Sequence, residues 1–281
     1  MDAIRPVFHA TEPVVVARPL TQFKRIVGAA ALSGLLAGLV LTAVQQWQVA
    51  PLIAQAEVFE DAAADQLVAP ATVQLNTGTA MQGAAHEHSA QPGHEQRSEQ
   101  DREQVRDQDH EHEHEWQPEN GWQRTVFSLL ANVTLAVGFG LLVGAAMNAT
   151  GRAVNWQRGL LWGVAGYLVL FVAPALGLPP ELPGTAAAPL QQRQLWWLFA
   201  VLASGSGLAC LTLTRSWLIR GAGLALIVAP LLMHAPLPLH PHSSAPAALA
   251  HDFVRASALA NALLWLVLSA AMGYWYRPAP N

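Results

Sequence analysis

Histidine is concentrated in one polar stretch of the chain, between residues 86 and 114. Glutamine, glutamate, aspartate, arginine and serine fill most of the space between the imidazoles. Imidazole is a good ligand for borderline divalent ions such as Co²⁺, Ni²⁺, Zn²⁺ and Cu²⁺. A histidine-rich composition therefore predicts a metal-binding segment. Its candidate ligands are His86, His88, His94, His110, His112 and His114.

The end of this tract alternates histidine with glutamate, from His110 to His114. On an extended chain the three imidazoles would share one face, opposite the two carboxylates. The same five residues satisfy His-Glu-x-x-His, the zinc-protease signature, which needs a helix inside a folded site. A charged tract without an apolar helix face lacks that context. We therefore predict metal capture, no catalytic residue and no enzyme activity. A solvated tract that selects no ion is the alternative.

A second, sparser group of histidines lies near the end of the chain and is rich in proline. It predicts a second metal site, because histidine is the commonest ligand for such ions. In this hypothesis the first tract collects ions and the second receives them at an entrance. The candidate ligands are His234, His240, His242 and His251, with Asp252 beside the last.

The overall composition is that of a membrane protein. Hydrophobic residues make up 52% of the 281 residues and charged residues only 12%, against about 25% in soluble domains. The net charge of −4 lies mostly in the polar tract, and no nucleic-acid partner is predicted. Cys210 is the only cysteine, which excludes an internal disulfide. Lys24 is the only lysine and Arg25 follows it, so a Walker A loop is excluded.

Long apolar runs predict the fold. We expect an all-α integral membrane protein with six transmembrane helices and a long polar His-rich loop outside the membrane after the first. Each run is near the 17–25 residues that cross a bilayer, and the third and fifth are at the low end. The six-span domain covers residues 24–277. The spans are expected at about 26–47, 126–147, 159–176, 195–213, 217–233 and 254–275.

Two segments outside the spans are predicted to lack stable structure. Residues 1–23 form a leader, and residues 62–120 form an inserted loop that contains the tract. Low hydrophobicity and dense charge cannot offset the entropy of ordering. A cleaved signal peptide is the alternative interpretation of the first run, but that run is longer than the usual 7–15 residues. Its Gly34-x-x-x-Gly38 pattern predicts close helix packing.

Lysine and arginine predict the orientation. They gather in the leader and in alternate loops, at Arg152 and Arg158, at Arg215 and Arg220, and at Arg277. The positive-inside rule then places both termini in the cytoplasm and both histidine groups outside. The predicted location is the inner membrane of a bacterium, as a multi-pass protein.

A few polar residues interrupt or flank the spans. Gln45, Gln46, Glu57 and Glu60 follow the first span, and the two glutamates would share one helix face. They could line a mouth or could anchor the helix at the interface. Asn132 lies within the second span. Such an asparagine joins helices more often than it lines a pathway.

Several segments together resemble the CbtA family of predicted cobalt transporter subunits. The first runs from Gly34 to Glu60 and includes Gln45-Gln-Trp-Gln-Val-Ala-Pro51. The others are Glu119–Asn132, Ala173–Gly184 and Arg193–Trp197, and the resemblance spans about residues 23–277.

The resemblance implies a membrane subunit of bacterial cobalt uptake for cobalamin synthesis. The cargo would be Co²⁺, with Ni²⁺ or Zn²⁺ as alternatives, and no tightly bound cofactor is expected. The resemblance also implies a small single-span CbtB-like subunit with a His-bearing end. A homo-oligomer in the lipid bilayer is a further expectation, because the spans hold few polar groups. A membrane-anchored metal sensor or storage scaffold without transport is the alternative function.

Overall fold

The structure is a computed structural model that describes residues 17–68, 121–151 and 154–276. The six histidines of the predicted tract, from His86 to His114, lie outside the described residues. So do the first part of the leader, residues 1–16, and most of the inserted loop, residues 69–120.

Helices dominate the described ranges, which contain no strand and only one isolated bridge, between Thr185 and Ser243. The two elements written η are π-helical turns that continue an α-helix. In chain order the elements are α1 (Ala17–Val44), η1 (Gln45–Val49), α2 (Ala50–Val68), α4 (Trp122–Ala149), α5 (Trp156–Tyr167), η2 (Leu168–Val172), α6 (Ala173–Ala175), α7 (Leu190–Leu213), α8 (Trp217–Leu232) and α9 (Ala247–Trp275).

Within the described part of the chain, five helices are long and apolar enough to cross a membrane. They are Leu20–Asp65, Trp122–Ala149, Trp156–Ala175, Leu190–Leu213 and Ala247–Trp275. The predicted all-helical membrane fold is confirmed to this extent. The apolar helix α8 has only 16 residues, so a sixth crossing stays a prediction.

The first long helix extends past two boundaries that the sequence suggested. Helix α1 begins at Ala17, inside the predicted leader of residues 1–23. The inserted loop does not begin at residue 62, because α1, η1 and α2 run on as one helix to Val68. The segment from Asp61 to Asp65 contains three alanines, and alanine has the highest helix propensity. Local propensity therefore extends the helix beyond the apolar run.

Helices α1 and α4 pack closely through glycine, as the Gly34-x-x-x-Gly38 pattern predicts. A Cβ on Gly34 would lie 2.6 Å from the backbone nitrogen of Val137, and one on Gly38 would lie 2.7 Å from the Cα of Val133. No side chain fits at such distances. Small residues let backbones approach in membranes, where van der Waals packing replaces the hydrophobic effect.

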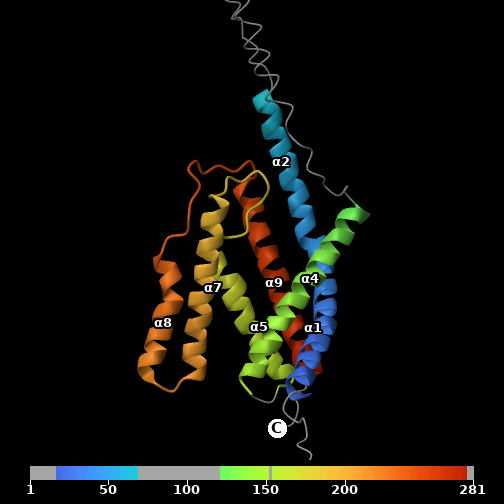
Figure 1. Ribbon diagram of the computed structural model, residues 1–281. Coiled ribbons are helices and arrows are strands. Elements are labelled where there is room, and N and C mark those ends of the chain that lie inside the picture. The colour runs from blue at the N-terminus through green and yellow to red at the C-terminus, as the bar shows by residue number, and fades with distance from the viewer. Residues whose placement is uncertain (1–16, 69–120, 152–153, 277–281) are drawn as a thin grey trace, which may run out of the picture.

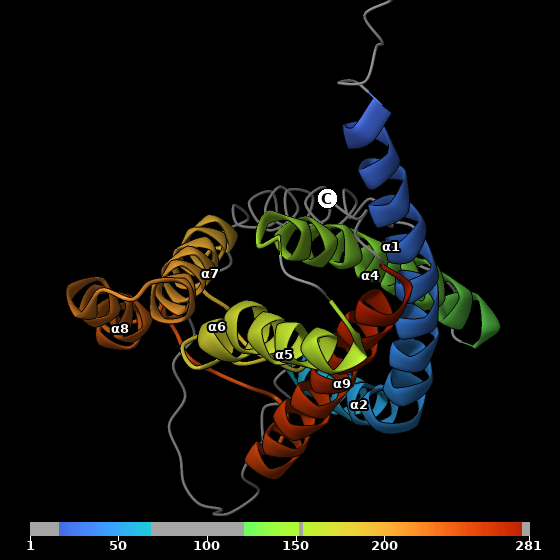
Figure 2. The ribbon, with the colours of Figure 1, turned by 90° about the horizontal axis from the view of Figure 1, so that it is seen from below.

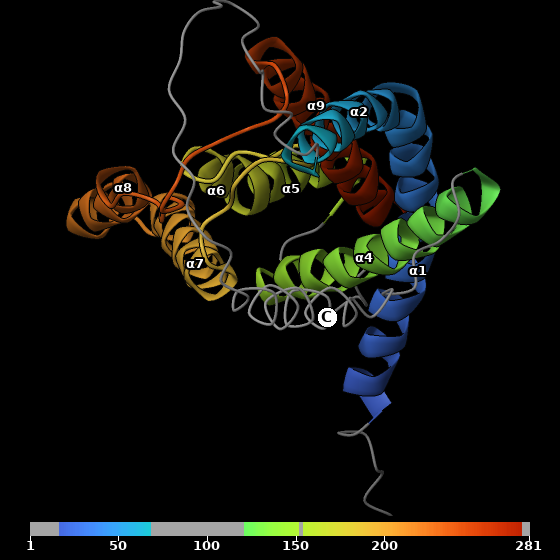
Figure 3. The same cartoon turned by 90° about the horizontal axis from the view of Figure 1, so that it is seen from above.

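The other helix pairs use the same device. Helix α5 packs on α9, where a Cβ on Gly163 would lie 2.7 Å from the carbonyl oxygen of Trp265. Helix α7 packs on α8, where a Cβ on Gly207 would lie 2.5 Å from the carbonyl oxygen of Gly223. The α7–α8 pair stands beside the group formed by α1, α4, α5 and α9, as views from opposite ends of the molecule show (Figures 2 and 3).

The two described ends of the chain lie at the same end of the molecule (Figure 1). We call this the terminal end, and we call the opposite end, with α2, the 176–189 connector and the 233–246 loop, the loop end. At the terminal end the Tyr276 hydroxyl donates to Asn148 Oδ1 at 2.9 Å and joins α9 to α4. Burial raises the pKa of Tyr276 above its usual 10.0, although the nearby charge of Arg25 opposes this.

The glycine packing predicts how two similar substitutions in α1 will differ. Gly34→Ala places a methyl group where the Val137 backbone lies, whereas Gly28→Ala meets nothing within 4 Å. We expect Gly34→Ala to destabilise the protein by about 1–3 kcal/mol, the range for overpacking. Thermal unfolding in detergent measures this, with Gly28→Ala as the control. Equal melting temperatures for the two variants would contradict the packing described.

Candidate functional site

The four histidines of the second predicted group lie at the loop end, and their side chains are exposed. His234, His240 and His242 belong to the loop between α8 and α9, and His251 lies in the first turns of α9. Within the described ranges, no three side chains of the types that ligate metals come together as a site. The structure therefore does not gather these histidines, and metal binding by them stays a prediction.

The loop that carries His242 is fixed by its backbone. The Ala186 amide donates to the His242 carbonyl at 2.9 Å, and the Ser244 amide donates to the Gly184 carbonyl at 3.2 Å. Gly184 has φ +71°, a conformation that glycine adopts without strain. The 233–246 loop and the 176–189 connector are therefore one covering layer at the loop end.

A buried polar cluster lies between α1, η1 and α4, and we call it the amide cluster. Asn132 Nδ2 donates to Gln45 Oε1 at 2.6 Å and to Thr42 Oγ1 at 3.0 Å. Thr42 donates in turn to the Gly38 carbonyl at 2.9 Å. Both Asn132 and Thr42 are more than nine-tenths buried. Asn132 therefore joins two helices, whereas a role in a metal pathway stays a prediction.

The amide cluster sits at an irregularity of the backbone. Gln45 is the first residue of η1, where the Ala50 amide donates to the Gln45 carbonyl, five residues back. Such π turns inside α-helices are frequent at functional sites. Gln46 follows in the same turn, but its side chain is exposed. The sequence pattern assigned Gln45 and Gln46 the same candidate role, but in the structure only Gln45 belongs to the amide cluster.

The two predicted glutamates have different surroundings. Glu57 Oε1 lies 3.0 Å from Arg124 Nη2, so the carboxylate links α2 to the start of α4. Glu60 is exposed, and its Cβ lies beside Gly184, at 3.3 Å from the position of an added Cβ. Glu60 is therefore at the edge of the covering layer, and its charge faces solvent.

Several residues that the sequence did not mark contact the predicted ones or link neighbouring elements. Arg124 and Thr42 are partners of two predicted residues, and their types alone gave no signal. Glu181 Oε2 lies 3.1 Å from Arg193 Nη2 and ties the connector to α7. Two buried serine hydroxyls, Ser33 Oγ and Ser269 Oγ, have no hydrogen-bond partner within the described residues.

Charge is distributed unequally between the two ends. Each carboxylate in the described ranges lies at the loop end, on α2, on the connector or near the start of α9. Described cationic side chains at the terminal end are on α1, α5, α8 and the 214–216 turn, with no carboxylate near them in the described chain. The carboxylates are Glu57, Glu60, Asp61, Asp65, Glu181 and Asp252, and these cations are Lys24, Arg25, Arg158, Arg215 and Arg220.

A comparison with family models matches residues 23–277 to CbtA, described as a probable cobalt transporter subunit. The chain belongs to the CbtA family. The CbtA match covers the described helices except the first six residues of α1, and it includes the amide cluster and the segments whose resemblance the sequence indicated. Comparison with curated proteins and with solved structures found no match.

CbtA membership and the apolar helices agree on the kind of protein. The family suggests a cobalt transporter subunit, and therefore not an enzyme, with cobalt as the transported ion. The five long apolar helices suggest a multi-pass membrane protein.

The amide cluster predicts that Asn132 contributes to stability through its contacts between helices. Asn132→Ala removes the donor to both Thr42 and Gln45, and we expect a loss of about 0.6–1.7 kcal/mol, the range measured for hydrogen bonds between membrane helices. Asn261→Ala is the matched control, because Asn261 donates to Ser257 of its own helix at 3.0 Å. Chemical unfolding of both variants in detergent measures the difference. A larger loss for Asn261→Ala would contradict this role of Asn132.

Proposed function

We propose that this chain is the membrane subunit of a bacterial divalent-metal uptake system whose main cargo is Co²⁺. The observation that carries the proposal is the CbtA match over residues 23–277. In this proposal the loop end faces the periplasm and receives the ion, and the terminal end faces the cytoplasm.

The charge distribution supports this orientation. Positively charged residues favour the cytoplasmic side of a membrane, and the terminal end carries Lys24, Arg25 and Arg158. The carboxylates at the loop end would raise the local concentration of cations. The loop end is also where the 69–120 segment leaves and rejoins the described helices (Figure 1).

Capture would begin with the histidine tract, which supplies imidazole ligands. The ion would then pass to His234, His240 and His242 on the second loop and to His251 at the start of α9. Imidazole suits Co²⁺, Ni²⁺ and Zn²⁺, so ligand type alone does not select cobalt. The next polar groups inward are Gln45 and Asn132, whose amide oxygens are neutral oxygen ligands. Glu57 and Glu60 lie on the way, at the loop end of the same long helix.

A partner subunit would complete the path. The helices hold few polar groups at membrane depth, and an ion without ligands is costly there. A small single-span CbtB-like subunit with a His-bearing end would supply ligands, and a second copy of this chain is the other source. The inner membrane of a bacterium is the expected location, and cobalamin synthesis the expected use.

The direct test is uptake of radiolabelled Co²⁺ and Ni²⁺ by cells that express this chain with and without the small subunit. We expect Co²⁺ accumulation that exceeds the empty-vector level and increases when the small subunit is present. Metal binding to the purified chain without any accumulation in cells would instead identify a sensor or a storage scaffold.

The histidine tract makes a separate prediction about capture. Replacing His110, His112 and His114 together with alanine should reduce the number of Co²⁺ ions bound, measured by isothermal titration calorimetry, because three imidazoles are lost. The triple replacement of His234, His240 and His242 is the comparison variant. An unchanged stoichiometry and affinity after the first replacement would remove the tract from the proposal.

Orientation can be tested without transport. Single cysteines at positions 112 and 242, in a Cys210→Ala background, should both react with a membrane-impermeant maleimide added to intact spheroplasts. A cysteine at Arg220 should react only after the membrane is opened, because Arg220 lies at the terminal end. Labelling of the two histidine positions from opposite sides would contradict the proposed arrangement.

A further inference from the structure

A short sequence recurs at the loop end of three helices. The triplet Val-Ala-Pro occurs four times in the chain. Three copies lie within the described residues, at 49–51 after α1, 172–174 after α5 and 228–230 in α8, and the fourth, at 68–70, extends beyond them. All three helices run from the terminal end to the loop end (Figure 1). In these three copies the triplet therefore has the same direction along the molecule.

The first two copies share a backbone geometry. In each, a π turn of five residues ends at the valine, and the alanine amide donates to the carbonyl five residues back: Ala50 to Gln45, and Ala173 to Leu168. The proline that follows has no amide hydrogen to donate. Each copy is thus a point where the helix lacks regular hydrogen bonds, and such points act as hinges and kinks.

The same two copies are followed by equivalent ion pairs. Glu57 comes six residues after Pro51 and Glu181 seven residues after Pro174. Each glutamate binds an arginine in the first turn of the next helix, Arg124 in α4 at 3.0 Å and Arg193 in α7 at 3.1 Å. The copy in α8 is followed by no such pair within the described residues, and Arg255 of α9 lies 3.8 Å from Asp252 of its own helix.

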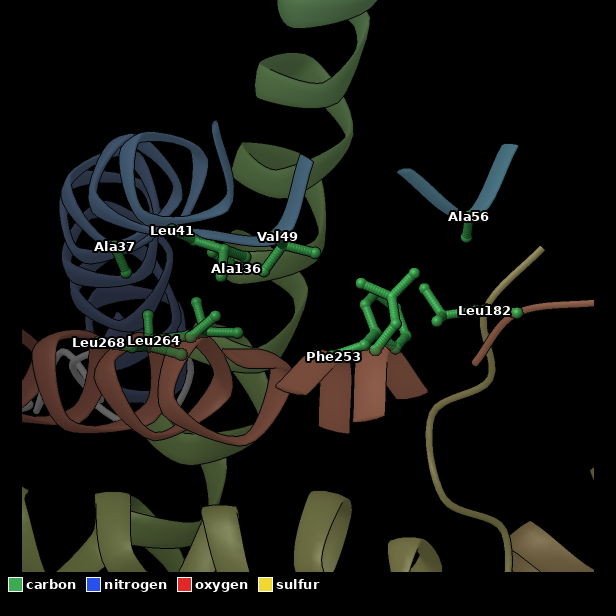
Figure 4. Packing of buried hydrophobic residues seen from close by; sticks show 12 residues of the cluster. Ala37, Leu41, Val49, Ala56, Ala136, Leu182, Phe253, Leu264 and Leu268 are labelled. Atoms are coloured by element: carbon green, nitrogen blue, oxygen red, sulfur yellow. The ribbon is translucent and has the colours of Figure 1, made fainter. Parts of the chain in front are cut away.

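The two ion pairs flank one buried apolar contact. Ala56 is next to Glu57, Leu182 is next to Glu181, and both belong to a buried cluster with Phe253 of α9 (Figure 4). Ala56 has no exposed surface and Leu182 is 4% exposed. The same cluster continues to Val49 and Leu41, beside the amide cluster. An ion that approached Gln45 along this face would have to part the cluster.

We propose that the α1–η1–α2 and α5–η2–α6 segments are two copies of one hinge-and-latch unit, and that together they form the gate of the loop end. Each hinge is the π turn before Ala-Pro, and each latch is the Glu–Arg pair. Half-exposed ion pairs are weak, so the latches can open without a large input of free energy. The role of the gate in ion entry rests on the proposed function. Its opening and closing do not, because they require no metal.

The test measures access to the closed contact in the purified protein. Ala56→Cys in a Cys210→Ala background introduces one thiol, and its rate of reaction with a maleimide reports opening. We expect Glu57→Arg and Glu181→Arg each to raise this rate by at least about twofold to fivefold, the effect of losing one surface ion pair. The reciprocal swaps, Glu57→Arg with Arg124→Glu and Glu181→Arg with Arg193→Glu, should restore the slow rate.

The exposed pair within α9 supplies the matched control. Asp252→Arg places like charges beside each other as the other variants do, but this pair joins no two elements, so the rate should not change. Glu57→Gln and Glu181→Gln, which keep the side-chain shape, replace the reversals if these fail to fold. Leu182→Cys provides a second reporter on the other side of the contact.

The outcomes separate the gate from the proposed function. An unchanged rate in the Glu57 and Glu181 variants, or swaps that fail to restore it, would overturn the gate whatever the uptake assays show. An increase for Glu57 alone would overturn the equivalence of the two units. The expected rates together with absent Co²⁺ uptake would leave the gate in place and reject the transport of cobalt.

Discussion

The close approach of α1 and α4 is the constraint on which the rest of the structure depends. Gly34 and Gly38 bring the two backbones so near that no Cβ fits between them. Only at this distance can Asn132 reach both Thr42 and Gln45. In hydrocarbon, these polar groups would otherwise lack partners at a high free-energy cost. Backbone packing and polar pairing therefore support each other, and together they fix where η1 begins.

Apolar length and glycine spacing predicted most of the helices, because both follow from the bilayer alone. The course of the first helix beyond the membrane could not be predicted in this way. Pro51 normally signals a helix end, yet α2 continues to Val68. The π turn before it shifts the hydrogen bonds by one residue, at the position where the proline ring would clash with the carbonyl four residues back in a regular α-helix. Whether a helix ends or continues at such a proline depends on its packing against other helices, and a local sequence pattern does not contain that information.

The candidate site was predictable in part for a similar reason. The sequence marked Asn132, Gln45 and Glu57 because polar residues are rare in or beside apolar runs. It could not pair them, since the partners Thr42 and Arg124 are ordinary residues brought near by the fold. The repeated Val-Ala-Pro was visible in the sequence and was missed. Its meaning required the orientation of the helices, because a triplet of common residues carries little information by itself.

The described helices also limit how a divalent ion could cross. Their carboxylates all lie at the loop end, and the polar groups deeper in the bundle are neutral amides and hydroxyls. Taking an ion out of water costs many kcal/mol unless charged or numerous ligands replace its hydration. A few neutral oxygen atoms on one side of a helix pair are not enough. An ion that passes the gate would therefore need ligands from another face as well, and a path shared between subunits follows from the distribution of charge alone.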